Sequence, residues 1–298
     1  MEVELARPIG FCSGVQRIVR LVEQLLQEKQ KIYCLGQLIH NPQEVARLGR
    51  LGLVTVGSLN GLPKDGRGRR FLIRAHGIPP QVREEVARRG YEIIDGTCPL
   101  VAAAHRDARR LVEEGYHLII VGHRDHPEVQ GILGEVSGAG SEPDVILDPE
   151  ELEVHRGERL GVISQTTQLP ERFAAVVAAS ARRARELRVI NTLCRETELR
   201  QEAVERFARQ VDLMLIIGGR NSSNTTRLAE IATRYTRCYH IESSTGLVRR
   251  WLIGKRRVGI SGGTSTPEWS ILEVKGEIER LMGGVNDGRE DGRVRDGQ

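Results

Sequence analysis

The stretch IDGTCPLVAAAHRDARRLVEEGYHLIIVGHRDHPEVQG, residues 94–131, contains the unit from which the chain is built. Cys98 and Pro99 follow a short strand-like run and open a segment with the apolar spacing of a helix, where proline suits the first position. A second apolar run, 117–122, leads into the pair His126 and Pro127 and another helical segment. This alternation of β-branched runs and amphipathic segments predicts an α/β fold with mostly parallel sheets covered by helices.

The same order of features occurs three times along the chain. Each of three cysteines is followed, 28 residues later, by a polar residue near the end of a predicted strand. These pairs are Cys12 and His40, Cys98 and His126, and Cys194 and Ser222. A second polar residue at a strand end follows the cysteines by 64, 68 and 71 residues, respectively. These residues are His76, Thr166 and Ser265. Because ligands bind beyond the carboxyl ends of parallel strands, three such units facing inward would bring these loops to one centre.

We therefore predict three similar lobes, each a small, mostly parallel sheet flanked by helices, in a pseudo-threefold arrangement. The first lobe is expected to span residues 1–97, including an N-terminal strand, the second 98–193 and the third 194–282. Predicted strands are 31–34, 71–75, 91–95, 117–122, 159–164, 189–192, 212–218 and 257–261, and predicted helices include 100–114, 171–187, 196–210 and 268–282. Residues 283–298 have almost no apolar side chain to bury, which predicts a disordered tail.

The composition argues against several classes of protein. The chain has 298 residues, of which 39% are hydrophobic, enough for a sizeable core. Its apolar runs are far shorter than the roughly 20 residues that cross a bilayer, and its N-terminus lacks the zones of a secretory signal. The net charge of +4 is spread over helical patterns, with only four phenylalanines for stacking on bases. We expect a cytoplasmic protein without a membrane or nucleic-acid partner.

Three of the five cysteines suggest a metal centre. Cys12, Cys98 and Cys194 are each expected at a strand-to-helix junction, where a helix N-terminus favours the thiolate that metals bind. Cys34 and Cys238 lie within apolar strand-like runs and are interpreted as packing residues. Without a CxxC pair the spacing is not a strong signal for zinc, so the spacing alone does not identify the metal. Three thiolates on a four-iron cluster would leave one iron free to bind a substrate oxygen as a Lewis acid.

Polar residues at the predicted strand ends are typical of a phosphate cradle. His40, His76, Ser222, Asn224 and Ser265 are hydrogen-bonding groups in positions where helix N-termini also present amides to anions. The same serines and asparagine could equally be ordinary helix caps, and the histidines could be structural.

Glu128 follows the His126-Pro127 pair. It could be an acidic first-turn residue favoured by the helix dipole, or a general acid if it lies beside a reacting oxygen.

A set of ordered segments gives the chain a specific resemblance. The segments are GFCSGVQR, IHNPQEV, RAHG, DGTCPLV, HPEVQGILG, SQTT, NTLCRETELRQEA, GGRNSSNTTRLAEI and GISGGTSTPEW. In this order, from about residue 7 to about residue 282, they closely resemble the 4-hydroxy-3-methylbut-2-enyl diphosphate reductases. This resemblance implies a three-lobed α/β fold with pseudo-threefold symmetry around one central 4Fe-4S cluster.

The resemblance also implies roles for individual residues. The cluster ligands would be Cys12, Cys98 and Cys194, and the proton donor would be Glu128. The diphosphate would be held by His40, His76, Ser222, Ser223, Asn224 and Ser265. His126 would approach the substrate and position Glu128, and Thr166 would lie near the substrate hydroxyl, with Thr167 in the same motif. Two departures concern loop detail only: Thr264 stands where alanine is frequent, and the pair Arg124 and Asp125 is more charged than usual.

The implied reaction removes the substrate hydroxyl with two electrons, which a ferredoxin or flavodoxin would supply, and gives isopentenyl and dimethylallyl diphosphate. This is the last step of the non-mevalonate isoprenoid pathway. Two other hypotheses remain. A three-cysteine cluster lyase similar to quinolinate synthase would consume no external electrons, and an iron-sulfur redox sensor would need an exposed basic recognition element.

Overall fold

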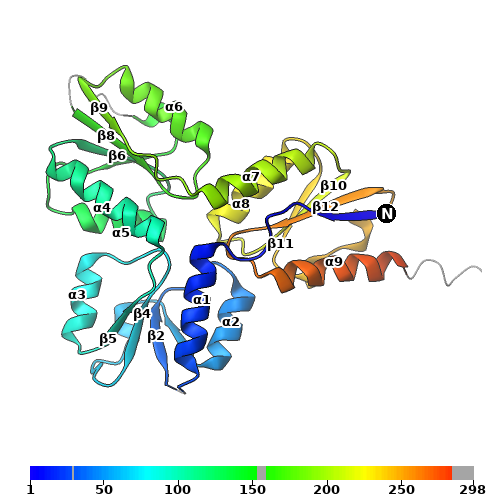
Figure 1. The fold of residues 1–298 in the computed structure, drawn as a ribbon, viewed down its shortest axis with the longest axis horizontal. Coiled ribbons are helices and arrows are strands. Elements are labelled where there is room, and N and C mark those ends of the chain that lie inside the picture. Colours follow the sequence, from blue (N-terminus) through cyan, green and yellow to red (C-terminus); the bar gives the residue numbers. More distant parts are fainter. Residues whose placement is uncertain (29, 153–158, 284–298) are drawn as a thin grey trace, which may run out of the picture.

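The computed structural model describes residues 1–28, 30–152 and 159–283. It contains three four-stranded sheets, and every strand pairing within them is parallel. Figure 1 shows three lobes, each a sheet with helices against it, that meet at the centre of the molecule. The predicted fold class is therefore confirmed.

The three lobes repeat one architecture. In the first, the strand order is β3-β2-β4-β5. Its elements are α1 (Ser13–Leu26), β2 (Ile32–Leu35), α2 (Pro42–Leu51), β3 (Leu53–Val56), β4 (Arg70–Ile73), α3 (Pro80–Arg88) and β5 (Glu92–Asp95). In the second, the order is β7-β6-β8-β9. Its elements are α4 (Pro99–Glu113), β6 (His117–Val121), α5 (Pro127–Val136), β7 (Asp144–Ile146), β8 (Arg159–Ser164), α6 (Pro170–Ala181) and β9 (Glu186–Val189).

The third sheet corrects one predicted boundary. Its order is β1-β12-β10-β11, and its elements are α7 (Arg195–Ala208), β10 (Leu213–Ile217), α8 (Ser223–Thr233), β11 (Cys238–Ile241), β12 (Arg257–Gly262), α9 (Glu268–Gly283) and β1 (Glu2–Leu5). We predicted the N-terminal strand within the first lobe, 1–97, but β1 pairs with β12. It takes the place that β5 and β9 hold in the other sheets, because α9 is not followed by a strand within the described residues. The boundaries at 97/98 and 193/194 stay predictions, and the predicted tail lies outside the described residues apart from Gly283.

The central strands explain why the sequence alternates as it does. Along β6, Leu118 and Ile120 pack into an apolar cluster on one face of the second sheet, and Ile119 and Val121 pack into a cluster on the other face. All four side chains are buried. A parallel strand covered on both faces is apolar at consecutive positions, which produces the continuous run seen in the sequence.

The element ends differ from prediction in a few places. The predicted helix 171–187 ends at Ala181, and the predicted strand 189–192 is β9, Glu186–Val189. The buried residues of this helix, Phe173, Val176 and Ser180, are followed by the segment 182–186, in which four of the five residues are charged, so the apolar face of the helix does not continue at helical spacing. The sequence also does not predict β3 and β7, which are edge strands of three or four residues with few buried side chains.

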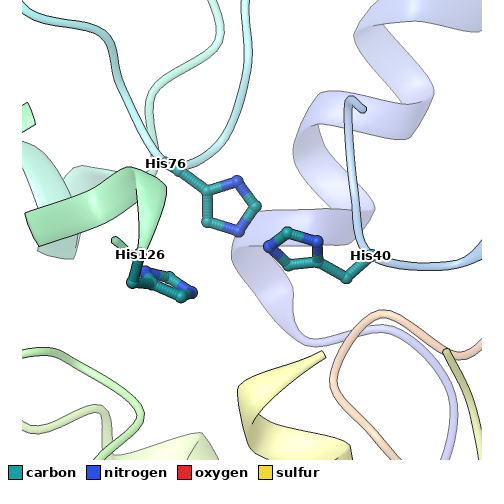
Figure 2. Close-up of side chains that lie close together, drawn as sticks. All are labelled: His40, His76 and His126. Carbon is teal, nitrogen blue, oxygen red and sulfur yellow. The ribbon is translucent and has the colours of Figure 1, made fainter. Parts of the chain in front are cut away.

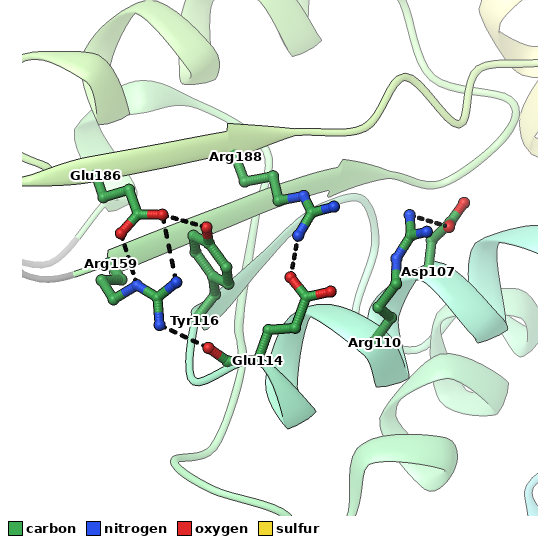
Figure 3. A network of polar contacts seen from close by, with 7 residues as sticks. All are labelled: Asp107, Arg110, Glu114, Tyr116, Arg159, Glu186 and Arg188. Carbon is green, nitrogen blue, oxygen red and sulfur yellow. Dashed lines mark hydrogen bonds and ion pairs between the residues drawn. The ribbon is translucent and has the colours of Figure 1, made fainter.

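A network of polar contacts lies at the outer end of the second lobe (Figure 3). The Arg159 guanidinium donates to the Glu186 carboxylate at 2.7 Å and to the backbone carbonyl of Glu114 at 2.6 Å, and it stacks over the Tyr116 ring. Arg188 pairs with the Glu114 carboxylate. Because Arg159 and Glu186 begin β8 and β9, the network lies at the amino ends of the strands, away from the loops that follow the carboxyl ends.

Among the helices of the described residues, none combines the length and the apolar composition that a membrane span requires.

Candidate functional site

One central pocket collects the loops at the carboxyl ends of the strands from all three lobes. Every residue to which the sequence analysis gave a role lines this pocket. These residues are Cys12, Cys98, Cys194, His40, His76, His126, Glu128, Thr166, Thr167, Ser222, Ser223, Asn224 and Ser265. The three repeated units therefore meet at one site.

The three cysteines lie at equivalent points of the three lobes. Each is the N-cap residue of a helix: Cys12 precedes α1, Cys98 precedes α4 and Cys194 precedes α7. The helix starts touch one another. A Cβ atom on Gly14 would lie 2.7 Å from the Cys98 sulfur, and the backbone N–H of Ser13 donates to the Glu196 carboxylate at 3.1 Å. Glycine at position 14 is thus what permits α1 to approach Cys98 so closely.

The thiols of the metal-free protein differ from the sequence prediction in their protonation. We expected the helix N-terminus to lower the thiol pKa, but burial raises the pKa of Cys12 to about 11 and also raises the pKa of Cys98. The N–H of Val15, which donates to the Cys12 sulfur at 3.4 Å, acts in the opposite direction and is outweighed. A bound metal deprotonates its thiol ligands outright, so binding at this site would release protons.

This arrangement fits an iron-sulfur group. Three soft sulfur ligands face one pocket from three different helices, and thiolates are the usual ligands of such clusters. Cys34 is fully buried in β2 and packs in the core of the first lobe, and Cys238 begins β11 against the core of the third. Neither lines the central pocket.

Three histidines form a cluster on one side of the pocket (Figure 2). The ring centroids are 4.5 Å apart for His40 and His76, 5.6 Å for His76 and His126, and 5.8 Å for His40 and His126. Burial lowers the pKa of His40 to about 4 and of His126 to about 3, and it lowers the pKa of His76 well below 6.5. These rings are therefore neutral near pH 7 in the ligand-free protein.

Several of these ring nitrogens lack partners. Within the described residues, both nitrogens of His40 and Nδ1 of His76 are buried without a hydrogen bond. Unpaired buried polar atoms are costly, so they indicate a ligand that completes them. Each ring can offer a nitrogen lone pair to a metal, with ligand atoms within 4.8 Å of one another, or an N–H to an anion.

Arg74 contributes positive charge to this cluster and was missed by the sequence analysis. It is half-buried, forms no ion pair with any described residue, and its Nε atom has no hydrogen-bond partner. Its charge lowers the pKa values of His40, His76 and His126. An unneutralised cation beside neutral imidazoles favours an anion over a metal cation at this position. The signal was present in the segment RAHG, two residues before His76.

The third lobe supplies hydroxyl and amide groups to the same pocket. The Ser222 hydroxyl caps α8 by accepting the N–H of Thr225 at 3.3 Å. Asn224 is buried, and neither atom of its side-chain amide has a partner among the described residues. Ser265 is also buried and follows β12. Together with the free amides at the start of α8, these groups suit an anion.

Glu128 is the acidic residue of the pocket and is 1% exposed. Its two carboxylate oxygens accept the N–H of Thr166 at 2.7 Å and the hydroxyl of Thr166 at 2.9 Å. Burial raises the pKa of Glu128 to about 7, although both hydrogen bonds act against this. His126 caps α5 by accepting the Glu128 N–H on Nδ1 at 3.2 Å. The group can therefore hold or release a proton near neutral pH.

Gln165 is a second residue that the sequence analysis missed. Its buried side chain donates to the hydroxyls of Thr167, at 2.9 Å, and Ser223, at 3.4 Å, and it accepts the N–H of His123. It thereby ties a loop of the second lobe to the start of α8 in the third. Its position within the segment SQTT could have marked it in the sequence. Its contact with Ser223 of the third lobe, however, depends on the tertiary structure.

Comparisons with known proteins agree with this geometry. The model of the LytB protein family matches residues 3–279. The chain is 43% identical to the 4-hydroxy-3-methylbut-2-enyl diphosphate reductase of Aquifex aeolicus, over 95% of this chain and 98% of the relative. It is 40% identical to the enzyme of the same name from Geobacter sulfurreducens, over 95% and 97%.

Two solved structures are similar to more than nine-tenths of the chain. One, described as (E)-4-hydroxy-3-methyl-but-2-enyl diphosphate reductase, the terminal enzyme of the non-mevalonate pathway, is 42% identical with a TM-score of 0.68, over 94% of this chain and 100% of that one. The other, the E-1-hydroxy-2-methyl-but-2-enyl-4-diphosphate reductase from Plasmodium falciparum, is 26% identical with a TM-score of 0.85, over 93% and 88%. The chain belongs to the LytB protein family.

Proposed function

We propose that this chain reduces 4-hydroxy-3-methylbut-2-enyl diphosphate to isopentenyl and dimethylallyl diphosphate, the last step of the non-mevalonate isoprenoid pathway. The observation that carries the proposal is the composition of the single central pocket. It combines three helix-capping thiols, a set of unpartnered anion-binding groups and a buried carboxyl group with a pKa of about 7. The names of the similar enzymes support the same activity.

The diphosphate end of the substrate is assigned to the first and third lobes. The unpaired nitrogens of His40 and His76 and the unpaired amide of Asn224 would complete their hydrogen bonds with phosphate oxygens. Ser222, Ser223 and Ser265 add hydroxyl groups from the third lobe. Arg74 supplies the nearby positive charge. Burying these groups without a ligand is costly, and the diphosphate removes that cost.

The thiol end of the pocket is assigned to one 4Fe-4S cluster with Cys12, Cys98 and Cys194 as its ligands. Such a cluster, when bound, supplies electrons one at a time and Lewis acidity at the iron that lacks a protein ligand. Gly14 leaves the space that brings α1 against Cys98. The partial exposure of all three thiols within one pocket gives the cluster access to the substrate.

Glu128 and Thr166 are assigned to proton transfer. The reaction takes up two electrons and two protons: the C4–O bond breaks, one proton leaves with the hydroxyl group as water, and the other joins an allylic carbon. Glu128 is protonated below a pH of about 7, and Thr166 is hydrogen-bonded to it. When Glu128 is protonated, its O–H can donate to the Thr166 oxygen while the threonine hydroxyl passes its own proton on, and His126 holds the start of α5 in place. Thr167 is assigned to substrate contact within the same loop.

The source of electrons and the cellular location belong to the same proposal. A ferredoxin or flavodoxin is the proposed donor, because the reaction needs two electrons that the chain itself does not supply. We place the protein in the cytoplasm, where cysteines remain available as thiols.

An anaerobic assay tests the proposed function. The reconstituted protein would be mixed with 4-hydroxy-3-methylbut-2-enyl diphosphate and reduced methyl viologen, while dye oxidation is followed and the products are identified. We expect two dye molecules oxidised per molecule of product, with both isomers formed. A protein that carries a four-iron cluster by spectroscopy yet oxidises no dye would instead support the lyase or the redox sensor.

A further inference from the structure

A second hollow lies on the outer side of α4, opposite the central pocket. It runs between α1, the loop before α3 and the first turns of α4. Four arginines and only two carboxylates supply its formal charges. These residues are Arg17, Arg83, Arg106, Arg109, Asp95 and Glu135. We refer to this hollow as the basic groove.

Two of the four arginines have no carboxylate partner among the described residues to offset their charge. Arg83 pairs with Asp95 at 2.7 Å, and Arg109 pairs with Glu135. Arg17 on α1 and Arg106 on α4 are exposed, and neither forms an ion pair with any residue that the structure describes. Burial lowers the pKa of His105, which also lines the groove, so this ring adds no positive charge near pH 7. The groove therefore presents a net excess of positive charge to solvent.

The first turn of α4 separates the basic groove from the thiols. Pro99 and Ala102 line the groove, whereas Cys98 and Val101 line the central pocket. An α-helix with its side chains is about 10–12 Å across, so a body seated in the groove lies one helix away from Cys98. Ile78 and Pro80 add apolar surface beside the arginines. The groove is also outside the pocket that would hold the substrate, so a partner can occupy it without excluding the substrate.

We propose that the basic groove docks a small acidic electron-carrier protein, which reduces the cluster from the Cys98 side. This inference rests on the proposed function, because that reaction consumes two electrons from outside the chain. Each docked carrier is oxidised by one electron, so two carriers are used for each C–O bond that is cleaved. Opposite charges on the two surfaces would speed their encounter and orient the carrier.

The test uses the complete, cluster-loaded enzyme with two electron sources. One is an acidic [2Fe-2S] ferredoxin kept reduced, and the other is reduced methyl viologen, which needs no docking surface. The variant is Arg17→Glu combined with Arg106→Glu. The matched control, Arg249→Glu with Arg250→Glu, changes the net charge equally at two exposed arginines of the third lobe that form no ion pair with described residues. Iron content and substrate KM are measured for each protein.

We expect the groove variant to raise the KM for ferredoxin by about tenfold or more at low ionic strength, since electrostatic steering changes association rates by roughly 10- to 1000-fold. Added salt should raise the wild-type KM towards that of the variant. Turnover with the dye should not fall, and the control should behave as the wild type. Equal ferredoxin KM values for the groove variant and the wild type would overturn the proposal, as would an equal loss in the control. A wild-type enzyme without dye-driven turnover would instead refute the proposed function itself.

Discussion

The protonation state of Glu128 results from burial working against two hydrogen bonds. Both Thr166 donors stabilise the carboxylate, yet burial dominates and brings the pKa to about 7. A general acid performs best when its pKa is near the working pH, because it then both holds and releases the proton. Glu128→Gln should keep the cluster and lower kcat by roughly 100- to 10,000-fold, the usual contribution of general acid catalysis. Iron content and dye-driven turnover measure the two effects, and an unimpaired kcat would remove Glu128 from this role.

The same carboxyl predicts a pH dependence. Because its folded-state pKa is raised from 4.5 to about 7, the stabilisation from the bound proton is complete below pH 4.5 and is lost as the pH rises through 7. At about 1.4 kcal/mol per pKa unit, the difference is about 3 kcal/mol. The lowered pKa values of His40, His76 and His126 act in the opposite sense in both proteins, so the effect of Glu128 is read from a comparison with Glu128→Gln. We expect the urea unfolding midpoint of the cluster-free wild type to fall over this range relative to that of Glu128→Gln. The Glu128→Gln variant should lack this part of the fall, and identical pH profiles for the two proteins would contradict the assignment.

The five cysteines divide into two groups by position. Cys34 and Cys238 pack among apolar side chains in two different lobes, and neither reaches the central pocket. Cys34→Ala and Cys238→Ala should therefore leave the iron content of the reconstituted protein unchanged, whereas Cys98→Ser should lower it. Iron and sulfide analysis of the folded variants checks this. Loss of iron from either alanine variant would show that the ligand set is misassigned.

At the level of elements, the start of α1 depends on one small residue. A methyl group at position 14 would lie 2.7 Å from the Cys98 sulfur, closer than such atoms approach. Gly14→Ala should therefore displace Cys98 and lower cluster occupancy, even though alanine is the better helix former. Gly276→Ala in α9 is the matched control, because a methyl group there meets no atom within 4 Å. It should stabilise the protein by about 0.5–1 kcal/mol and keep the cluster. Equal iron contents for both variants would argue against the close approach of α1.

Elements with strong patterns could be predicted from the sequence, and short edge elements could not. Strand β6 is buried on both faces, so nearly every one of its positions is apolar. Edge strands β3 and β7 bury few side chains, so little in their composition separates them from loops. The same limit applies to the site. Cysteines and histidines at strand ends mark the pocket in the sequence, whereas Arg74 and Gln165 act through contacts that the fold alone creates.

At the level of the whole molecule, the chain is a threefold repeat whose last strand comes from its beginning. The strand that precedes Cys98 is β5, the one that precedes Cys194 is β9, and the one that precedes Cys12 is β1. All three are the fourth strand of a sheet with one common order. Sequence order alone places β1 with the first lobe, because spatial pairing between the two ends of the chain leaves no local signal. This connection makes the path from β1 to Cys12 a bridge between the third lobe and the first.

Arg200 holds the segment between β1 and Cys12 in place through hydrogen bonds. This α7 side chain is 2% exposed, and its guanidinium donates to the carbonyls of Pro8 at 3.0 Å, Gly10 at 2.8 Å and Gly262 at 3.3 Å. It thus joins the segment that leads into Cys12, the helix that starts at Cys194 and the end of β12. No described carboxylate forms an ion pair with it, and burial lowers its pKa although the nearby Glu196 carboxylate acts in the opposite direction.

Arg200→Met fills a similar volume but leaves three carbonyl groups without this donor, and the contacts of two of them, Gly10 and Gly262, are buried. Because an unsatisfied buried group costs about 1–3 kcal/mol, we expect a loss of at least about 2 kcal/mol in the free energy of unfolding of the cluster-free protein. Arg280→Met is the control, since Arg280 is exposed and, among the residues that the structure describes, pairs only with Glu277 on the same helix. Urea denaturation should show a lower midpoint for Arg200→Met and an unchanged midpoint for Arg280→Met. If the two midpoints coincide, packing rather than the Arg200 guanidinium holds the lobes together. The segment from β1 to Cys12 would then not depend on the hydrogen bonds from Arg200 for its stability.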